Sequence, residues 1–115
     1  MKLFIMRHGE TNYNVKGLCA DTDTKEVCLT DKGKEQIVAA AALLQSEPID
    51  VIYVSNMYRT QQCADIINED HHVDVVVDPR INERITGFDG KPIAAFHEFI
   101  KDDVFGKKKE GAENF

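Results

Sequence analysis

Short apolar runs that alternate with helix-like stretches most constrain the fold of this chain. The apolar runs are rich in aliphatic and β-branched residues, which favours strands, and they cover residues 2–6, 50–54 and 73–77. Other stretches carry apolar residues at helical spacing, which predicts helices from Asp31 up to Pro48, over about 57–69 and over 93–100. Strands that alternate with helices are typical of a mostly parallel sheet. The sequence therefore predicts an α/β fold.

Polar residues mark where the predicted helices begin. Thr30 or Asp31 can cap the first helix. Ser55 and Asn56 can cap the second, whose inner face is expected to carry Cys63, Ile66 and Ile67. We expect loops in two turn-rich segments, residues 7–28 and 80–91.

Length and charge narrow the class of protein. The chain has 115 residues, which is enough for one compact domain over residues 1–115. Its residues are 43% hydrophobic and 30% charged, as in a globular protein rather than a disordered one. The net charge of −6 argues against general nucleic-acid binding. The longest basic run, Lys107–Lys109, is interpreted as a solvated loop.

Residue spacing argues against metal, redox and membrane chemistry. Cys19, Cys28 and Cys63 form no Cys-x-x-Cys pair, so we predict reduced thiols in a cytoplasmic protein. Asp102 and Asp103 have no histidine at ligand spacing and are interpreted as solvated charges. The apolar run near the amino terminus is too short for a signal peptide or a membrane span. We therefore expect no metal, no cofactor and no membrane partner.

The stretch Met-Arg-His-Gly-Glu-Thr, residues 6–11, carries the strongest chemical signal. It follows the predicted strand 2–6, so Arg7 and His8 stand at the carboxyl end of a strand, where open α/β sheets bind ligands. Gly9 permits a sharp turn and a close approach of a ligand to the backbone. An imidazole nucleophile beside a guanidinium suits a phosphoryl group. Taken alone, such an Arg-His pair is more often a surface group that forms ion pairs.

Four sequence blocks in a fixed order add to this signal. They are Arg7–Thr11 with Asn14, Leu29 and Thr30 with Gly33 and Gln36, Ser55 with Arg59–Gln61, and Glu83 with Gly87, Gly90 and Lys91. Together these blocks resemble the histidine phosphatase superfamily, the group that includes phosphoglycerate-mutase-like enzymes. The resemblance covers nearly the whole chain and implies a three-layer α/β/α sandwich with a mostly parallel sheet.

The resemblance implies a catalytic role for four residues. His8 would be the nucleophile that forms a phosphohistidine, with one ring nitrogen free and the other donating to a backbone carbonyl. Arg7 and Arg59 would bind the nonbridging oxygens of the phosphoryl group. Glu83 would protonate the leaving group and later activate water.

Residues near His8 are candidates for a second tier of contacts. Asn14 can donate an amide hydrogen to the same phosphate, although an asparagine alone is more often a turn residue. Thr11 can cap a helix or donate to the ligand. Glu10 is expected to face solvent.

One residue of the family pattern has no counterpart in the chain. The family carries a second catalytic histidine after a late strand, whereas His71, His72 and His97 are interpreted here as surface or packing residues. The chain therefore resembles the amino-terminal part of the family domain, incomplete at its carboxyl-terminal side. Without the late strand, strand 2–6 becomes an open edge. We expect the chain to pair through that edge as a homo-oligomer, or to be part of a longer protein.

These observations lead to one main hypothesis and two alternatives. The main hypothesis is a phosphatase that hydrolyses a small phosphate monoester through a phosphohistidine on His8. A phosphoglycerate-mutase-type transfer is the first alternative, but mutases of the family carry tryptophans near the opening motif and this chain has none. The second is a noncatalytic phosphate-binding or assembly module, which would keep Arg7, His8 and Arg59 as an anion pocket without turnover.

Overall fold

A computed structural model describes residues 1–101 of the chain. Its elements in chain order are α1 (Asn12–Lys16), α2 (Asp31–Leu44), β1 (Val51–Val54), α3 (Tyr58–Asn68), β2 (Asp74–Val77), the 3₁₀ turn η1 (Pro79–Ile81) and α4 (Ile93–Ile100). The three predicted helices and the second and third predicted strands are thus confirmed. The interpreted charges at Asp102 and Asp103 and the basic run Lys107–Lys109 lie outside the described residues.

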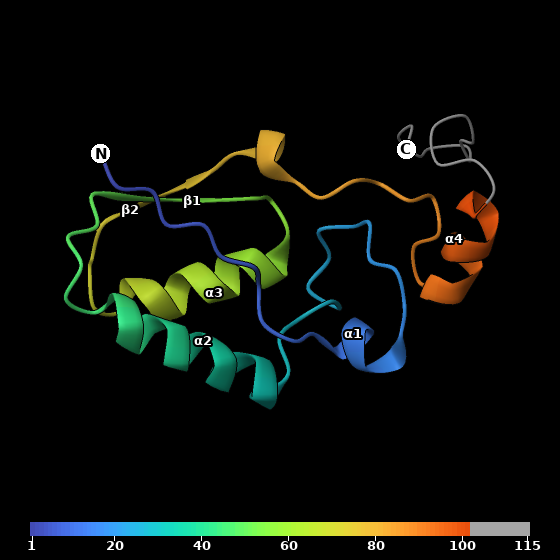
Figure 1. Cartoon of the computed structure of the whole chain (residues 1–115), viewed down its shortest axis with the longest axis horizontal. Coiled ribbons are helices and arrows are strands. Elements are labelled where there is room, and N and C mark those ends of the chain that lie inside the picture. Colours follow the sequence, from blue (N-terminus) through green and yellow to red (C-terminus); the bar gives the residue numbers. More distant parts are fainter. Residues whose placement is uncertain (102–115) are drawn as a thin grey trace.

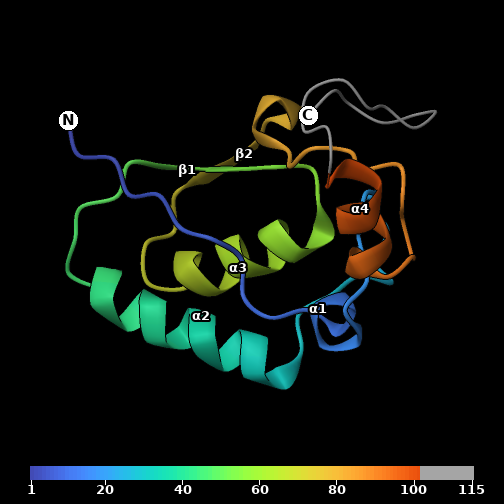
Figure 2. The same cartoon turned by 45° about the vertical axis from the view of Figure 1, so that its right-hand side comes forward.

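β1 and β2 form a parallel sheet whose strands are joined by α3. Val51 pairs with Asp74 and Val54 with Val77. Both α2 and α3 lie on one face of this sheet (Figures 1 and 2). The α/β class with a parallel sheet is therefore confirmed, and the described residues supply the sheet and one helical layer. On β1, Val51 and Tyr53 are exposed.

The hydrophobic core lies between α2, α3 and the sheet. Helical spacing places apolar side chains of both helices on their facing sides. The buried cluster consists of Leu29, Ile37, Ala41, Cys63 and Ile67, with Leu44, Ile52 and Ile66 packed against it. The expected inner face of α3 is confirmed by this packing.

The predicted helix caps hold for α2 but not for α3. Thr30 caps α2, because its Oγ1 accepts a hydrogen bond from the Gly33 backbone N at 3.0 Å. The cap predicted from Ser55 and Asn56 is wrong, since Met57 is the N-cap of α3 and has no side-chain cap bond. Ser55 instead places its Oγ 2.8 Å from the Thr60 hydroxyl, inside the first turn.

The buried strand predicted for residues 2–6 is wrong. This segment runs past the sheet towards α1 (Figures 1 and 2), and Leu3 and Ile5 are 74% and 86% exposed. A strand needs a partner for its backbone N–H and C=O groups, and the sheet in residues 1–101 consists of β1 and β2. An apolar run alone does not supply that partner. Pairing of copies through residues 2–6 stays a prediction.

The segment after residue 8 is docked onto the start of α2. A Cβ atom at Gly33 would overlap the backbone oxygen of Glu10, and one at Gly9 would overlap the carbonyl of Gly33. The Thr30 backbone N donates to Glu10 O at 3.0 Å, and the Thr30 hydroxyl donates to Glu10 Oε1 at 2.9 Å. Glu10 is only partly exposed to solvent, and its carboxylate also holds the helix cap.

We expect Gly33→Ala to destabilise the protein by about 1–3 kcal/mol, as overpacking of a rigid contact does. Alanine is favoured over glycine inside a helix by about 1 kcal/mol, but the added methyl group would meet the Glu10 backbone and not a flexible side chain. Urea unfolding measures the difference, with Glu35→Ala on the exposed side of the same helix as the control. A Gly33→Ala protein as stable as the parent would contradict this contact.

Candidate active site

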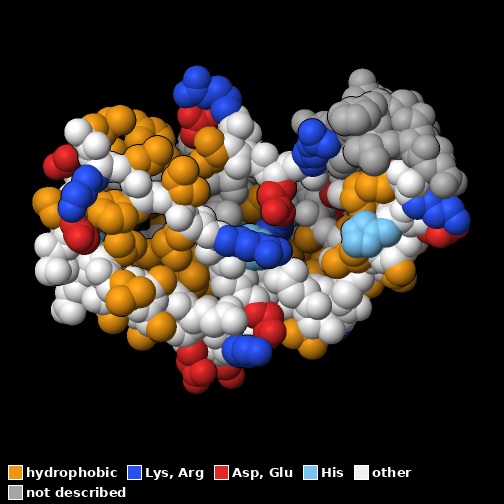
Figure 3. Space-filling view, viewed as in Figure 1, with side chains coloured by type: hydrophobic (Ala, Val, Ile, Leu, Met, Phe, Trp, Pro, Cys, Tyr) orange, Lys and Arg blue, Asp and Glu red, His pale blue; other side chains and the backbone are white. Residues whose placement is uncertain are grey.

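All six residues singled out in the sequence line one cleft of about 410 Å³. Three precede α1, one lies within it, one lies in the first turn of α3, and one follows η1; they are Arg7, His8, Thr11, Asn14, Arg59 and Glu83. Figure 3 shows the hollow between the part of the molecule that carries the sheet and the part that carries α4, with basic, acidic and histidine side chains gathered at it. The fold therefore brings together residues that are far apart in the sequence.

The His8 ring is oriented by the chain that follows it. Its Nδ1 lies 2.7 Å from Gly9 O, and because a carbonyl oxygen only accepts, Nδ1 carries the proton of the neutral ring. Nε2 therefore keeps the lone pair. Burial lowers the pKa of His8 below its ordinary value and the charge of Arg59 lowers it further, which outweighs the opposing effect of the Gly9 hydrogen bond. Both effects favour the neutral, nucleophilic imidazole.

We expect His8 to remain neutral to a lower pH than a histidine in an unfolded chain. Its pKa lies below the ordinary value of 6.5, so the Nε2 lone pair is lost only as the pH falls through that lower value. Because the folded state binds this proton less readily than the unfolded state, the same group also makes folding less favourable as the pH falls. An NMR titration of the ring protons, compared with a peptide of residues 5–11, measures the shift. A midpoint at or above that of the peptide would contradict the burial effect.

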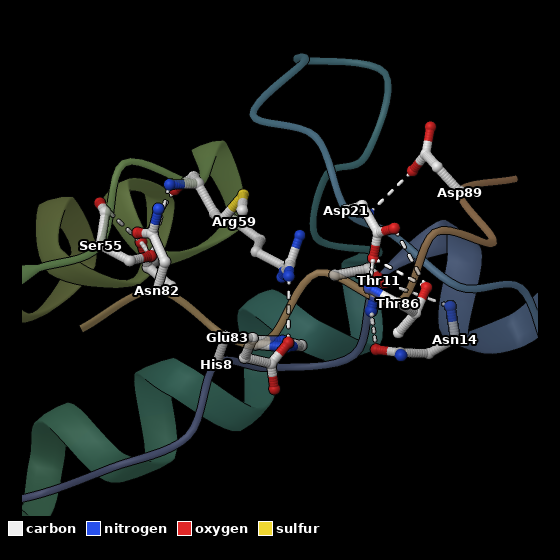
Figure 4. A network of polar contacts seen from close by, with 12 residues as sticks. His8, Thr11, Asn14, Asp21, Ser55, Arg59, Asn82, Glu83, Thr86 and Asp89 are labelled. Atoms are coloured by element: carbon white, nitrogen blue, oxygen red, sulfur yellow. Dashed lines mark hydrogen bonds and ion pairs between the residues drawn. The ribbon is translucent and has the colours of Figure 1, made fainter. Parts of the chain in front are cut away.

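Arg59 and Glu83 form an ion pair in the cleft. Arg59 Nη2 donates to Glu83 Oε2 at 3.1 Å, and the Arg59 residue is only 3% exposed, whereas the Glu83 side chain is 63% exposed. Figure 4 shows both side chains beside His8. A guanidinium has five N–H donors in a planar fork, so Arg59 can hold the carboxylate and still donate to an anion. The pair places a buried cation and an accessible carboxylate next to the imidazole.

Asn82 fixes the loop that bears Glu83. The Asn56 backbone N donates to Asn82 Oδ1 at 3.0 Å, which ties the turn between β1 and α3 to the loop after η1 (Figure 4). Arg59 lies in the helical turn that follows Asn56. This contact brings the segment that carries Arg59 close to the loop that carries Glu83. Asn82 was not predicted as a site residue, and its only signal in the sequence was its position next to the candidate acid.

The unexpected helix α1 accounts for the positions of Thr11 and Asn14. Thr11 Oγ1 accepts from the Asn14 backbone N at 3.1 Å, and Asn14 Oδ1 accepts from the Thr11 backbone N at 2.9 Å, which is a capping box. Gly17 ends the helix with a φ of 66°. The Thr-x-x-Asn spacing followed by glycine is a helix signal that the loop prediction for residues 7–28 overlooked. Capping engages Asn14 Oδ1, so Nδ2 is the end of the amide that can donate to a ligand.

The far wall of the cleft is built around Asp21, Thr86 and Asp89, which were not predicted as site residues. Asp21 accepts from the Thr86 backbone N at 2.9 Å, from the Thr86 hydroxyl at 2.9 Å and from the Gly87 backbone N at 2.8 Å. Asp89 Oδ1 in turn accepts from the Asp21 backbone N at 2.8 Å (Figure 4). These bonds join the loop after α1 to the loop before α4. They hold one end of α4 at the cleft, which Ile93, Phe96 and His97 line.

Two of the three later histidines lie away from this cleft. His71 and His72 stand between α3 and β2 and do not line it. His97 is exposed, its ring centroid lies 5.9 Å from that of Phe96, and it lines the same cleft as His8. His97 is therefore a surface and packing residue, as interpreted from the sequence, and its ring also borders the candidate site.

Residues 1–101 show neither a grouping of metal ligands nor a membrane-spanning helix. No group of three or more His, Cys, Asp and Glu side chains in this range could hold a metal ion. Cys19, Cys28 and Cys63 are free thiols. None of the helices described in this range has the length and the apolar character that crossing a membrane requires.

A parallel α/β sheet with a histidine, a buried arginine and a carboxylate in one cleft is typical of proteins that handle phosphoryl groups. The sequence model of the histidine phosphatase superfamily (branch 1) matches residues 3–111. The chain belongs to that superfamily.

Individual relatives include both mutases and phosphatases. The chain is 42% identical over 84 residues to the 2,3-bisphosphoglycerate-dependent phosphoglycerate mutase of Thermoplasma acidophilum, a match that covers 72% of this chain and 42% of that protein. It is 32% identical over 87 residues to the adenosylcobalamin/alpha-ribazole phosphatase of Escherichia coli, covering 76% of this chain and 42% of the relative. The chain therefore spans less than half the length of these two curated relatives.

Solved structures show the same fold. The alpha-ribazole phosphatase from Shigella flexneri superposes with a TM-score of 0.84 at 25% identity, over 96% of this chain and 57% of the other. The relatives are enzymes of the histidine phosphatase and phosphoglycerate mutase family.

Proposed function

We propose that the protein is a phosphatase that hydrolyses a small phosphate monoester through a phosphohistidine on His8. The observation that carries this proposal is the oriented His8 ring. Gly9 O holds Nδ1, so the Nε2 lone pair is available to a ligand in the cleft, beside the buried guanidinium of Arg59.

The reaction proceeds in two displacements at phosphorus. His8 Nε2 attacks and forms an N–P bond while the bond from phosphorus to the ester oxygen breaks. Arg7 and Arg59 bind the nonbridging oxygens, and Asn14 and Thr11 add hydrogen bonds to them. Glu83, in its protonated form, gives its proton to the departing oxygen, and the resulting carboxylate then takes one from the water that attacks the phosphohistidine. The products are an alcohol, inorganic phosphate and regenerated His8.

The phosphatase is favoured over the mutase on a single sequence observation. The chain has no tryptophan, whereas mutases of the family carry tryptophans near the opening motif. Relatives of both kinds match it, so transfer to a phosphoglycerate acceptor is the second candidate. Free thiols at Cys19, Cys28 and Cys63 support a cytoplasmic location for either activity.

Trapping the intermediate tests the proposal. The protein is mixed with an aryl phosphate that carries radioactive phosphorus, quenched in alkali, and divided between acid and alkaline incubation. We expect a label that is lost in acid and kept in alkali, and inorganic phosphate as the product in water. A label that passes to added phosphoglycerate would favour the mutase. Saturable phosphate binding without any label would overturn the enzyme and favour the noncatalytic module.

A further inference from the structure

The cleft has two chemically different halves. The half around His8 and Arg59 is polar and cationic. The half on the α4 side is lined by apolar side chains, which are Leu18, Ala20, Ile93 and Phe96. We propose that this apolar half binds the alcohol part of the substrate and selects esters of aromatic or otherwise apolar alcohols, with Phe96 as the main contact. The inference rests on the proposed function, because it assumes that phosphate occupies the polar half.

The apolar half is held in place by backbone hydrogen bonds from the loop after α1. Ile93 N donates to Gly17 O at 2.8 Å, Cys19 N donates to Lys91 O at 2.8 Å, and Gly90 N donates to Cys19 O at 2.9 Å. The Asp21 and Thr86 bonds described above secure the same pair of loops. A wall fixed in this way loses little conformational freedom when a ligand binds.

Phe96 is itself oriented by neighbouring rings. The ring of the buried residue Phe88 packs edge-on against Phe96, with 5.9 Å between centroids. It also packs against Phe99 in a tilted arrangement, with 5.5 Å between centroids. Phe96 lines the cleft and is only partly buried, whereas Phe99 lies on the same helix and does not line it. Phe96 therefore contributes to the surface of the cleft, and an aromatic group gains most from contact with an aromatic surface.

Charge in this half favours an uncharged alcohol. Asp21 lines the cleft on the α4 side. A second anionic group on the substrate would meet this carboxylate, at a cost in affinity. Arg84 and His97 also line the cleft, so preference for a second anion is the competing outcome, and the test includes a ligand that carries one.

Calorimetric titration with phosphonates, which are not hydrolysed, tests the inference without requiring turnover. The three ligands are methylphosphonate, phenylphosphonate and 3-phosphonopropionate. We expect phenylphosphonate to bind about tenfold more tightly than methylphosphonate, the scale of one aromatic contact, and 3-phosphonopropionate to bind no better than methylphosphonate. Phe96→Ala is expected to remove the preference for the phenyl group while methylphosphonate affinity stays within a factor of about two.

Two variants separate ligand contact from helix packing. Phe96→Leu keeps apolar area without the ring and should keep part of the preference. Phe99→Ala removes a ring that packs on Phe88 outside the cleft, and it should leave the preference in place. Equal affinity for phenyl and methyl ligands, tighter binding of 3-phosphonopropionate, or an equal loss in Phe96→Ala and Phe99→Ala would each overturn the inference. If none of the three phosphonates binds, the anion site of the proposed function fails, and the inference fails with it.

Discussion

His8→Asn is expected to abolish the acid-labile phosphate label completely. Asparagine has a side chain of similar polarity but no imidazole lone pair, so no N–P bond of the phosphohistidine kind can form. We attribute the expected loss of label to the missing lone pair and not to a steric effect. Asparagine is smaller than the half-buried histidine, so it adds no volume to the cleft. Labelling of the variant and the parent under the same conditions, with quantification after alkaline quenching, measures the effect.

A matched substitution keeps this result interpretable. His72→Asn removes an exposed histidine outside the cleft, at a position with a φ of 55° that asparagine tolerates well. This variant should label as the parent does. Equal labelling in His8→Asn and the parent would show that the phosphate is attached elsewhere, and it would remove the central residue of the proposed mechanism.

Arg59→Ala is expected to slow phosphorylation of His8 by roughly 10²–10³, the cost of losing one positioned donor to a reacting group. Arg59 is the buried cation of the cleft, and it also holds Glu83 at 3.1 Å, so the substitution removes a phosphate contact and releases the candidate acid. Arg59→Lys keeps the charge but lacks the planar fork, and its rate should lie between those of the parent and the alanine variant. Rates from rapid quenching give the comparison directly.

Two controls separate the loss of the Arg59 phosphate contact from a loss of positive charge and from unfolding. Arg80→Ala removes an exposed arginine that pairs with Asp78 and does not line the cleft, so it controls for the loss of one positive charge. Circular dichroism and urea unfolding establish that Arg59→Ala is folded under the assay conditions. A folded Arg59→Ala protein with the labelling rate of Arg80→Ala would rule out Arg59 as a phosphoryl ligand.

Local patterns predicted most elements of the fold and one of its caps. Helical spacing was sufficient to predict α2 and α3, and apolar runs were sufficient to predict β1 and β2. Each of these signals lies within a single element. Thr30 caps α2 for the same local reason. The strand expected at residues 2–6 failed because strand formation depends on a partner elsewhere in the chain.

The short helix α1 was not predicted from the sequence, although it is present in the structure. Its capping box and terminal glycine were present in the sequence, but five residues without a buried face give no periodic signal. Helices this short depend on their caps and on packing more than on propensity. The sequence patterns of residues 7–28 therefore favoured a loop.

The amino-acid order already shows which residue types are available for phosphoryl chemistry and that Arg7, His8 and Gly9 are consecutive, because covalent bonds set the order of residues. The contact between buried Arg59 and Glu83, and the Asp21 bonds that fasten the α4 wall to the cleft, arise only when the chain folds. These contacts join groups 24 and 65 positions apart, and no local pattern encodes such pairs. Their geometry depends on how α2, α3 and the sheet pack, which is a property of the whole fold.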